Sequence, residues 1–153
     1  MGVQRLCYWK RCRGGHVPYN AVCGGEDLGG ESLYVGRASH SGDLVPGKLV
    51  PSHGVCYVSW GEGEHGHDNY EVLVSNDALL QWLRASNGSV PSGAIQGGVT
   101  VTGERLYIGR ARHHNTLTLG KVHPSHGCLY LPFAGNEHRY TEYEALVCMT
   151  INF

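Results

Sequence analysis

The sequence carries the same pattern twice. The stretch GGEDLGGESLYVGRASH begins at Gly24, and GGVTVTGERLYIGRARH begins at Gly97. When the two halves are aligned on these stretches, Arg5–Ser75 matches Ala78–Cys148 without a gap, and roughly four in ten of the paired positions are identical. The repeat predicts two equivalent units, over residues 1–76 and 77–153, that pack as one globular protein.

Short apolar segments broken by Gly, Pro and Asn recur in each copy: SLYVGRA, CYVSW and YEVLV, then RLYIGRA, CLYLPF and YEALVC. Segments of this length and composition predict β-strands. The stretch DALLQWLRAS could form a helix capped by Asp77, but its aligned counterpart RLCYWKRCR has no helical stripe. Two copies of one fold should share their elements, so we expect strands in both places and an all-β fold with two pseudo-equivalent antiparallel halves.

Charge and composition exclude several classes of partner. The 12 Lys and Arg residues balance 13 Asp and Glu residues, so no net field attracts nucleic acid or an anionic membrane. The N-terminal stretch MGVQRLCYWKRCRGG lacks the apolar segment of a secretory signal, and no run approaches the ~18 apolar residues of a membrane span. We expect a soluble protein without membrane insertion, either cytoplasmic or released without a secretory signal peptide.

The 6 cysteines never align with one another in the two copies, so the fold does not require disulfides. We expect mostly reduced, partly buried thiols, and without a C-x-x-C pair there is no thiolate framework for zinc. The 10 histidines show no spacing that fixes a metal geometry. Ser52-His53 and Ser125-His126 are adjacent in sequence, but neighbours seldom point at each other and no oxyanion device is visible. We therefore expect a protein that is not an enzyme and that has neither a metal site nor a cofactor.

Recognition of a small sugar needs less machinery. A pair of adjacent hydroxyls is bound well by an ionised carboxylate that accepts two hydrogen bonds, together with a cation that donates one. Asp27 and Lys48, on turn-flanked positions beside glycines, fit that requirement, and Lys121 repeats Lys48 in the second copy. An isolated lysine is ordinarily only solvated, but its persistence directly after a shared glycine makes a binding role a serious alternative.

The two copies share the form GG…G-E-x-L-Y-[VI]-G-R-A-x-H…G-K…P-S-H-G…Y…E-H…Y-E-x-L-V, which resembles the DM-nine repeat family, and their arrangement as a pair is similar to the mannose-binding lectins of bivalve molluscs. The resemblance covers nearly the whole chain. It implies an all-β protein whose repeats pack about a pseudo-twofold axis, exchange a strand and often dimerise. It also implies calcium-independent binding of D-mannose and mannose-rich glycans through an Asp and a Lys, which fall on Asp27 and Lys48.

The second copy departs from this pattern, because Thr100 replaces the acid although Lys121 is retained. Asp43, which could assist in the first copy, becomes Thr116. Replacing charge-assisted hydrogen bonds by a hydroxyl costs about 1–3 kcal/mol, so we expect Lys121 and Thr100 to form a weaker site, or none. Glu104 or Asn115 could compensate.

The leading functional hypothesis is a pattern-recognition lectin of innate immunity, whose weak sites gain strength by multivalency on mannose-rich microbial surfaces. The alternative is an intracellular interaction or stress-response protein that keeps the repeat fold without binding sugar. Trp60, aligned with Phe133, is expected in the core rather than in the sugar site.

Overall fold

The computed structural model describes residues 6–76 and 78–149. Each repeat forms its strands in the same order. The first contains β1 (Cys7–Arg13), β2 (Cys23–Glu26), β3 (Ser32–His40), β4 (Asp43–Val50), β5 (Val55–Trp60), β6 (Gly63–His67) and β7 (Asn69–Ser75). The second contains β8 (Leu80–Ser86), β9 (Gln96–Val99), β10 (Arg105–His113), β11 (Thr116–His123), β12 (Cys128–Phe133), β13 (Asn136–Tyr140) and β14 (Glu142–Cys148).

The all-β prediction is confirmed. Within the described ranges the helical elements are single 3-10 turns: η1 (Leu28–Gly30), η2 (Pro51–His53) and η3 (Pro124–His126). The stretch that could have been a helix is β8, and its counterpart is β1, as the repeat predicted. The proposed cap of that helix, Asp77, lies outside the described residues. No helix in residues 6–76 or 78–149 is long and apolar enough to cross a membrane.

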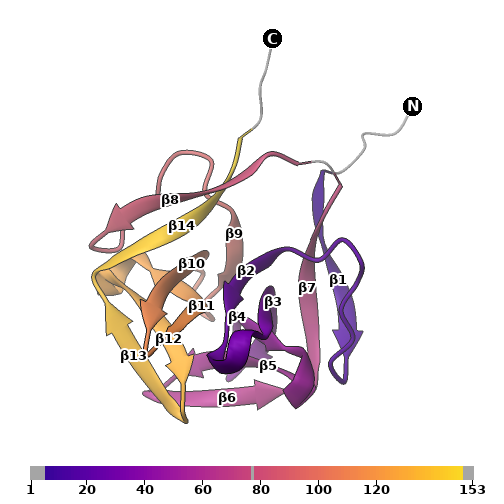
Figure 1. Cartoon of the computed structure of the whole chain (residues 1–153). Helices are drawn as coiled ribbons and strands as arrows, with labels where there is room; N and C mark the ends of the chain where they lie inside the picture. The colour runs from indigo at the N-terminus through magenta and orange to yellow at the C-terminus, as the bar shows by residue number, and fades with distance from the viewer. Residues whose placement is uncertain (1–5, 77, 150–153) are drawn as a thin grey trace.

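Each repeat extends a short strand into the other. β2 pairs with β3 of its own repeat and with β11 of the second, where Glu26 lies opposite Leu117. β9 pairs with β10 and with β4 of the first repeat, where Val99 lies opposite Leu44. The pairings close a ring of strands in the order β3-β2-β11-β12-β13-β6-β5-β4, with β4 paired back to β3. Figure 1 shows the two halves side by side, with β2 and β9 between them.

The hydrophobic core also joins the repeats. Its shared cluster consists of buried aliphatic side chains from both: Leu33, Val35, Val50, Leu73, Ile108, Leu119 and Leu146. Burying one such side chain stabilises the fold by about 1.5–3 kcal/mol. Because these side chains bury one another across the repeat boundary, neither repeat can complete this cluster alone.

The second glycine of each pair in the opening motif is explained by close backbone approach rather than by positive φ. A Cβ atom on Gly98 would lie 1.9 Å from the Leu44 carbonyl oxygen, and one on Gly25 would lie 2.3 Å from the Leu117 carbonyl oxygen. These carbonyls belong to the opposite repeat. Only glycine therefore lets β2 approach β11, and β9 approach β4, closely enough to pair with them.

The thiols are unpaired in the structure. All 6 cysteines are free, with Cys56 and Cys128 buried and Cys23 exposed. Burial raises the pKa of the Cys56 thiol to about 12, so it remains protonated and behaves as a small apolar side chain.

The glycine contact gives a stability prediction. Gly98→Ala should lower the free energy of unfolding by about 3 kcal/mol, because the methyl group collides with backbone that cannot rotate away. Gly103→Ala is the control: Gly103 has a positive φ of +93° but open space around it, so only backbone strain of about 1 kcal/mol is expected. Urea unfolding of both variants measures the difference, and equal losses would contradict a steric role for Gly98.

Candidate functional site

Lys48 lies inside strand β4 rather than on a solvated turn. Lys48 is only 3% exposed, and in the sheet it lies opposite Tyr57 on β5 and Val35 on β3. The sequence interpretation treated it as a turn-flanked surface lysine with glycine beside it. The glycine is present, but Gly47 is needed because a Cβ there would lie 2.0 Å from the Tyr57 carbonyl oxygen. A buried cation requires partners, since leaving it unpaired in the interior is costly.

Those partners are a carboxylate and two aromatic rings. Lys48 Nζ lies 3.4 Å from Glu64 Oε2, and the two side chains are only 4% and 11% exposed. The same nitrogen is 5.2 Å from the centre of the Phe133 ring and 5.7 Å from that of Tyr57, within cation–π range. Phe133 comes from the second repeat. Glu64 Oε1 also accepts a 2.9 Å hydrogen bond from the Gly135 N–H, so Glu64 links the site to the second repeat as well.

Asp27 lies in the loop that follows β2. It caps the turn η1, where its Oδ1 accepts a 2.9 Å hydrogen bond from the Leu28 N–H. Its own N–H donates to the Glu31 carbonyl oxygen at 2.8 Å, which closes the loop. The Asp27 side chain is half-buried. Its second carboxylate oxygen therefore remains available to a ligand in the described structure.

Glu31 and Tyr57 are fixed by their own hydrogen bonds. The Ser52 hydroxyl and backbone N–H both donate to the Glu31 carboxylate, at 2.6 Å and 2.8 Å, and these bonds hold the pKa of Glu31 below its ordinary value. The Tyr57 hydroxyl is 2.8 Å from His53 Nδ1. Burial raises the pKa of Tyr57, and the nearby carboxylates of Glu64 and Asp27 raise it further.

The structure brings Asp27 and Lys48 to one cavity of about 450 Å³. Its wall is formed by both repeats and consists of Asp27, Leu28, Glu31, Lys48, Val50, Ser52, His53, Tyr57, Glu64, Phe133 and Ala134. The sequence argument found the acid and the lysine of this cavity. Glu64 and Phe133 were not predicted, because the sequence does not show which side chains of β6 and of the second repeat face Lys48.

The second repeat reproduces much of this arrangement. Lys121 is 5% exposed, and its Nζ lies 3.6 Å from Glu137 Oε2 and 5.4 Å from the centre of the Tyr130 ring. Thr100 does not replace the carboxylate chemically. Its hydroxyl accepts a 3.0 Å hydrogen bond from the Glu104 N–H and lies 3.0 Å from the Thr102 hydroxyl, so it serves the loop.

The expectations about Asp43, Asn115, Glu104 and Trp60 need correction. Asp43 was expected to assist in the first copy, but its hydrogen-bond partners are Trp60 of its own repeat and Val101 of the second repeat. Asn115 adopts a left-handed turn at φ 63° and is exposed, and Glu104 is occupied by Ser125 and His123. Trp60 is half-buried and outside the hydrophobic core clusters rather than within them.

The histidines pack against one another rather than around a common point. In the first repeat the His40 ring stacks on His65 at 4.1 Å and its Nδ1 lies 3.0 Å from His67 Nε2. Burial lowers the pKa of His40, and the neighbouring histidines lower it further. The described part of the chain contains no group of three or more His, Cys, Asp or Glu side chains placed to hold a metal ion.

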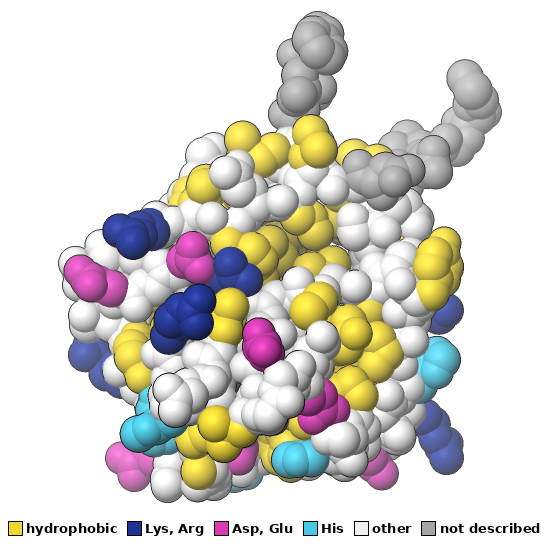
Figure 2. All heavy atoms as spheres, viewed as in Figure 1, with side chains coloured by type: hydrophobic (Ala, Val, Ile, Leu, Met, Phe, Trp, Pro, Cys, Tyr) yellow, Lys and Arg dark blue, Asp and Glu magenta, His cyan; other side chains and the backbone are white. Residues whose placement is uncertain are grey.

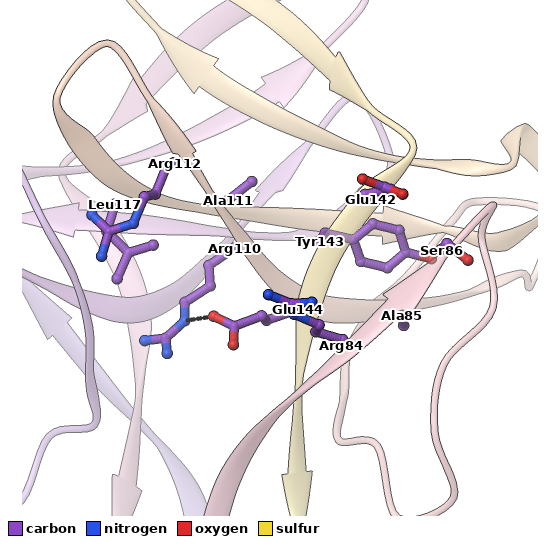
Figure 3. A pocket seen from close by; sticks show the side chains of 10 residues that line it. All are labelled: Arg84, Ala85, Ser86, Arg110, Ala111, Arg112, Leu117, Glu142, Tyr143 and Glu144. Carbon is purple, nitrogen blue, oxygen red and sulfur yellow. Dashed lines mark hydrogen bonds and ion pairs between the residues drawn. The ribbon is translucent and has the colours of Figure 1, made fainter.

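Another cavity, of about 900 Å³, lies elsewhere, between β8, β10 and β14. Figure 3 shows Arg110 and Glu144 extended toward each other from two of its strands. Arg110 Nε lies 3.0 Å from Glu144 Oε1. Arg110 also donates to the Gly24 carbonyl oxygen at 2.9 Å and lies 4.2 Å from the centre of the Trp82 ring. Its guanidinium is thus committed to holding the exchanged strand β2. Arg37 makes the equivalent contacts in the first repeat.

The surface carries no broad field of one sign on the face shown in Figure 2, where basic and acidic side chains are interspersed. This distribution agrees with the near-neutral net charge of −1. The cavity that contains Asp27 combines carboxylates with a buried lysine and aromatic rings, an arrangement that suits a small polar ligand.

Comparison with known proteins identifies the family. A sequence profile of the DM9 repeat matches residues 2–42 and 27–140. The chain belongs to the DM9 repeat family. It is also similar to natterins of Thalassophryne nattereri: 32% identical to Natterin-4 over 140 residues, covering 90% of this chain and 33% of that protein, and 38% identical to Natterin-3 over 93 residues, covering 60% of this chain and 23% of that protein. The chain spans about a third or less of these relatives.

A solved structure shows the same fold. The nematode sperm cell motility protein MFP2B superposes with a TM-score of 0.71 over 97% of this chain and 49% of that chain, at 14% sequence identity. At this identity the likeness concerns the fold alone. The resemblance to DM9 repeats inferred from the motifs is thus confirmed, together with the all-β fold.

The buried ion pair gives a prediction. Glu64→Gln should lower the free energy of unfolding by about 2 kcal/mol, because it keeps the volume and the bond from Gly135 but removes the charge that faces Lys48. Glu62→Gln, at an exposed side chain two residues away, is the matched control and should change stability by less than about 0.5 kcal/mol. Thermal unfolding of both variants is the measurement, and a Glu64→Gln protein as stable as the control would contradict the buried pair.

Proposed function

We propose that the chain is a calcium-independent lectin that binds D-mannose and mannose-rich glycans in the cavity containing Asp27 and Lys48. The observation that carries this proposal is that a half-buried carboxylate and a buried lysine open into one cavity of about 450 Å³, a size typical of small-molecule sites. Membership of the DM9 repeat family supports it. We propose binding rather than catalysis, with no metal or cofactor.

The chemistry of the cavity suits a pyranose. Asp27 has a carboxylate oxygen free to accept from a sugar hydroxyl, and the Lys48 ammonium donates to sugar oxygens. The rings of Tyr57 and Phe133 present apolar faces to the C–H face of the sugar. Because Glu64 and two rings already hold the ammonium, little side-chain entropy is lost on binding.

Weak single sites need multivalency to hold a cell surface. We propose that the protein recognises mannose-rich glycans on microbes as part of innate immunity, and that a homodimer would increase its avidity. The free thiols favour the alternative of an intracellular interaction protein, since disulfides are rare in reducing compartments. Mannose-reversible aggregation of killed yeast cells is expected for the lectin, whereas the intracellular alternative predicts no aggregation.

Sugar affinity is the direct test. Calorimetric titration of D-mannose in EDTA should give binding heat equal to that in calcium. Asp27→Asn should weaken binding at this site about tenfold or more while preserving the bond from Leu28, and Lys48→Met should do the same.

Exposed residues of matched type provide the controls. Asp68→Asn and Lys10→Met should leave affinity unchanged, because both positions lie on the surface away from the cavity. Loss of binding in EDTA would show that a metal is required. If no binding heat is found at millimolar mannose, the lectin proposal fails and the intracellular interaction protein becomes the better hypothesis.

A further inference from the structure

The first repeat contributes a carboxylate to the half of the molecule that contains Lys121. Asp43 begins β4, and β4 pairs with β9 so that Leu44 lies opposite Val99. The next position in this antiparallel register places Asp43 opposite Thr100. Asp43 Oδ1 accepts a 2.8 Å hydrogen bond from the N–H of Val101, which holds the carboxylate at this end of the strand pair.

The same register occurs at the Asp27 cavity with the residue types exchanged. Leu117 lies opposite Glu26, and the next position places Thr116 opposite Asp27. Each half of the molecule therefore sets one aspartate against one threonine across an exchanged strand. The acid that is missing at Thr100 is present on the strand that faces it.

Trp60 provides an aromatic surface beside this carboxylate. It aligns with Phe133, which lines the Lys48 cavity. Its Nε1 donates a 3.2 Å hydrogen bond to Asp43 Oδ2, and its side chain is half-buried, so part of the indole remains exposed. An indole face next to a carboxylate suits a ligand that is apolar on one side and hydroxylated on the other, as a pyranose is.

Lys121 completes the set. Its side chain is 6% exposed, and Glu137 Oε2, 3.6 Å from its Nζ, is a buried atom with no hydrogen-bond partner in the described part of the chain. Burial lowers the pKa of Lys121, while the carboxylates of Glu137 and Asp43 act in the opposite direction. Asp27 and Lys48 line one cavity, and Thr100 and Lys121 are their counterparts in the second repeat. Asp43, bonded to Val101 beside Thr100, therefore lies on the side of the second repeat that carries Lys121.

We propose that the chain has a second sugar-binding site, formed by Lys121 and Glu137 of the second repeat with Asp43 and Trp60 of the first. This inference rests on the proposed function, because the ligand is the same class, a neutral hexose with adjacent hydroxyls. Asp43 takes the part that Asp27 takes in the first cavity. One chain is then bivalent without a dimer, which supplies the avidity that weak sites need.

The two sites can be followed separately by nuclear magnetic resonance of the full chain during titration with D-mannose in EDTA. The Leu28 backbone amide reports on Asp27 and the Val101 amide reports on Asp43, because each donates to that carboxylate. The Trp60 indole N–H is a second reporter of the Asp43 site. The indole signals of Trp9 and Trp82, which pack on arginines, are internal controls that should not move. Trp60→Phe assigns the indole signal.

The expected result is that Leu28, Val101 and the Trp60 indole all titrate in the unmodified protein. Asp43→Asn should weaken the Trp60 titration about tenfold or more and leave that of Leu28 unchanged. Asp27→Asn should do the reverse.

Three outcomes would overturn the second site. Titration of Leu28 without movement of Val101 and Trp60 in the unmodified protein would remove it and leave the proposed function standing. An unchanged Trp60 titration in folded Asp43→Asn would remove the role of Asp43. No titration of any signal would overturn both proposals. Because the unmodified protein gives the first answer, a variant that fails to fold does not affect it.

Discussion

The close approach of a carbonyl oxygen to glycine at each exchanged strand is the contact on which the rest of the structure depends. Gly25 lies against the Leu117 carbonyl and Gly98 against that of Leu44, and no other residue type leaves room for them. Through these contacts β2 and β9 cross to the opposite repeat, where β2 joins the ring of strands and β9 pairs with β4. β4 and β11 are each flanked by paired strands on both sides, and these two strands carry Lys48 and Lys121.

Burial of these lysines determines the chemistry of both halves. A buried ammonium group needs a carboxylate and polarisable neighbours, and Lys48 finds them in Glu64 and in rings from both repeats. The cost of ordering a long, flexible side chain is therefore met during folding rather than on ligand binding. Arg37 and Arg110 have a different part: their guanidinium groups bond to backbone carbonyls of the exchanged strands and do not need a ligand to be satisfied.

The tandem repeat was enough to predict strands, including the assignment of β8 against its helical composition, because aligned segments must share a structure. It also placed Asp27 and Lys48 together through the family resemblance. The burial of Lys48 was not predictable, since glycine followed by lysine is common in exposed turns. Here the glycine is required because the Tyr57 carbonyl oxygen on β5 leaves no room for a Cβ atom. The role of Asp43 was misjudged because the alignment compares a residue with its copy, whereas the pairing of β4 with β9 places Asp43 beside Val101 of the second repeat.

The distribution of acids between the repeats bears on how such a pair can assemble. The first repeat carries both Asp27 and Asp43, and the second carries Thr100 and Thr116 at the matching positions. Two copies of the first repeat joined in this manner would set carboxylate against carboxylate at each crossing, and two copies of the second would have no acid at either. Joining unlike halves places one aspartate and one threonine at each crossing. The duplicated halves have thus become complementary at these positions, because each supplies the residue type that the other lacks.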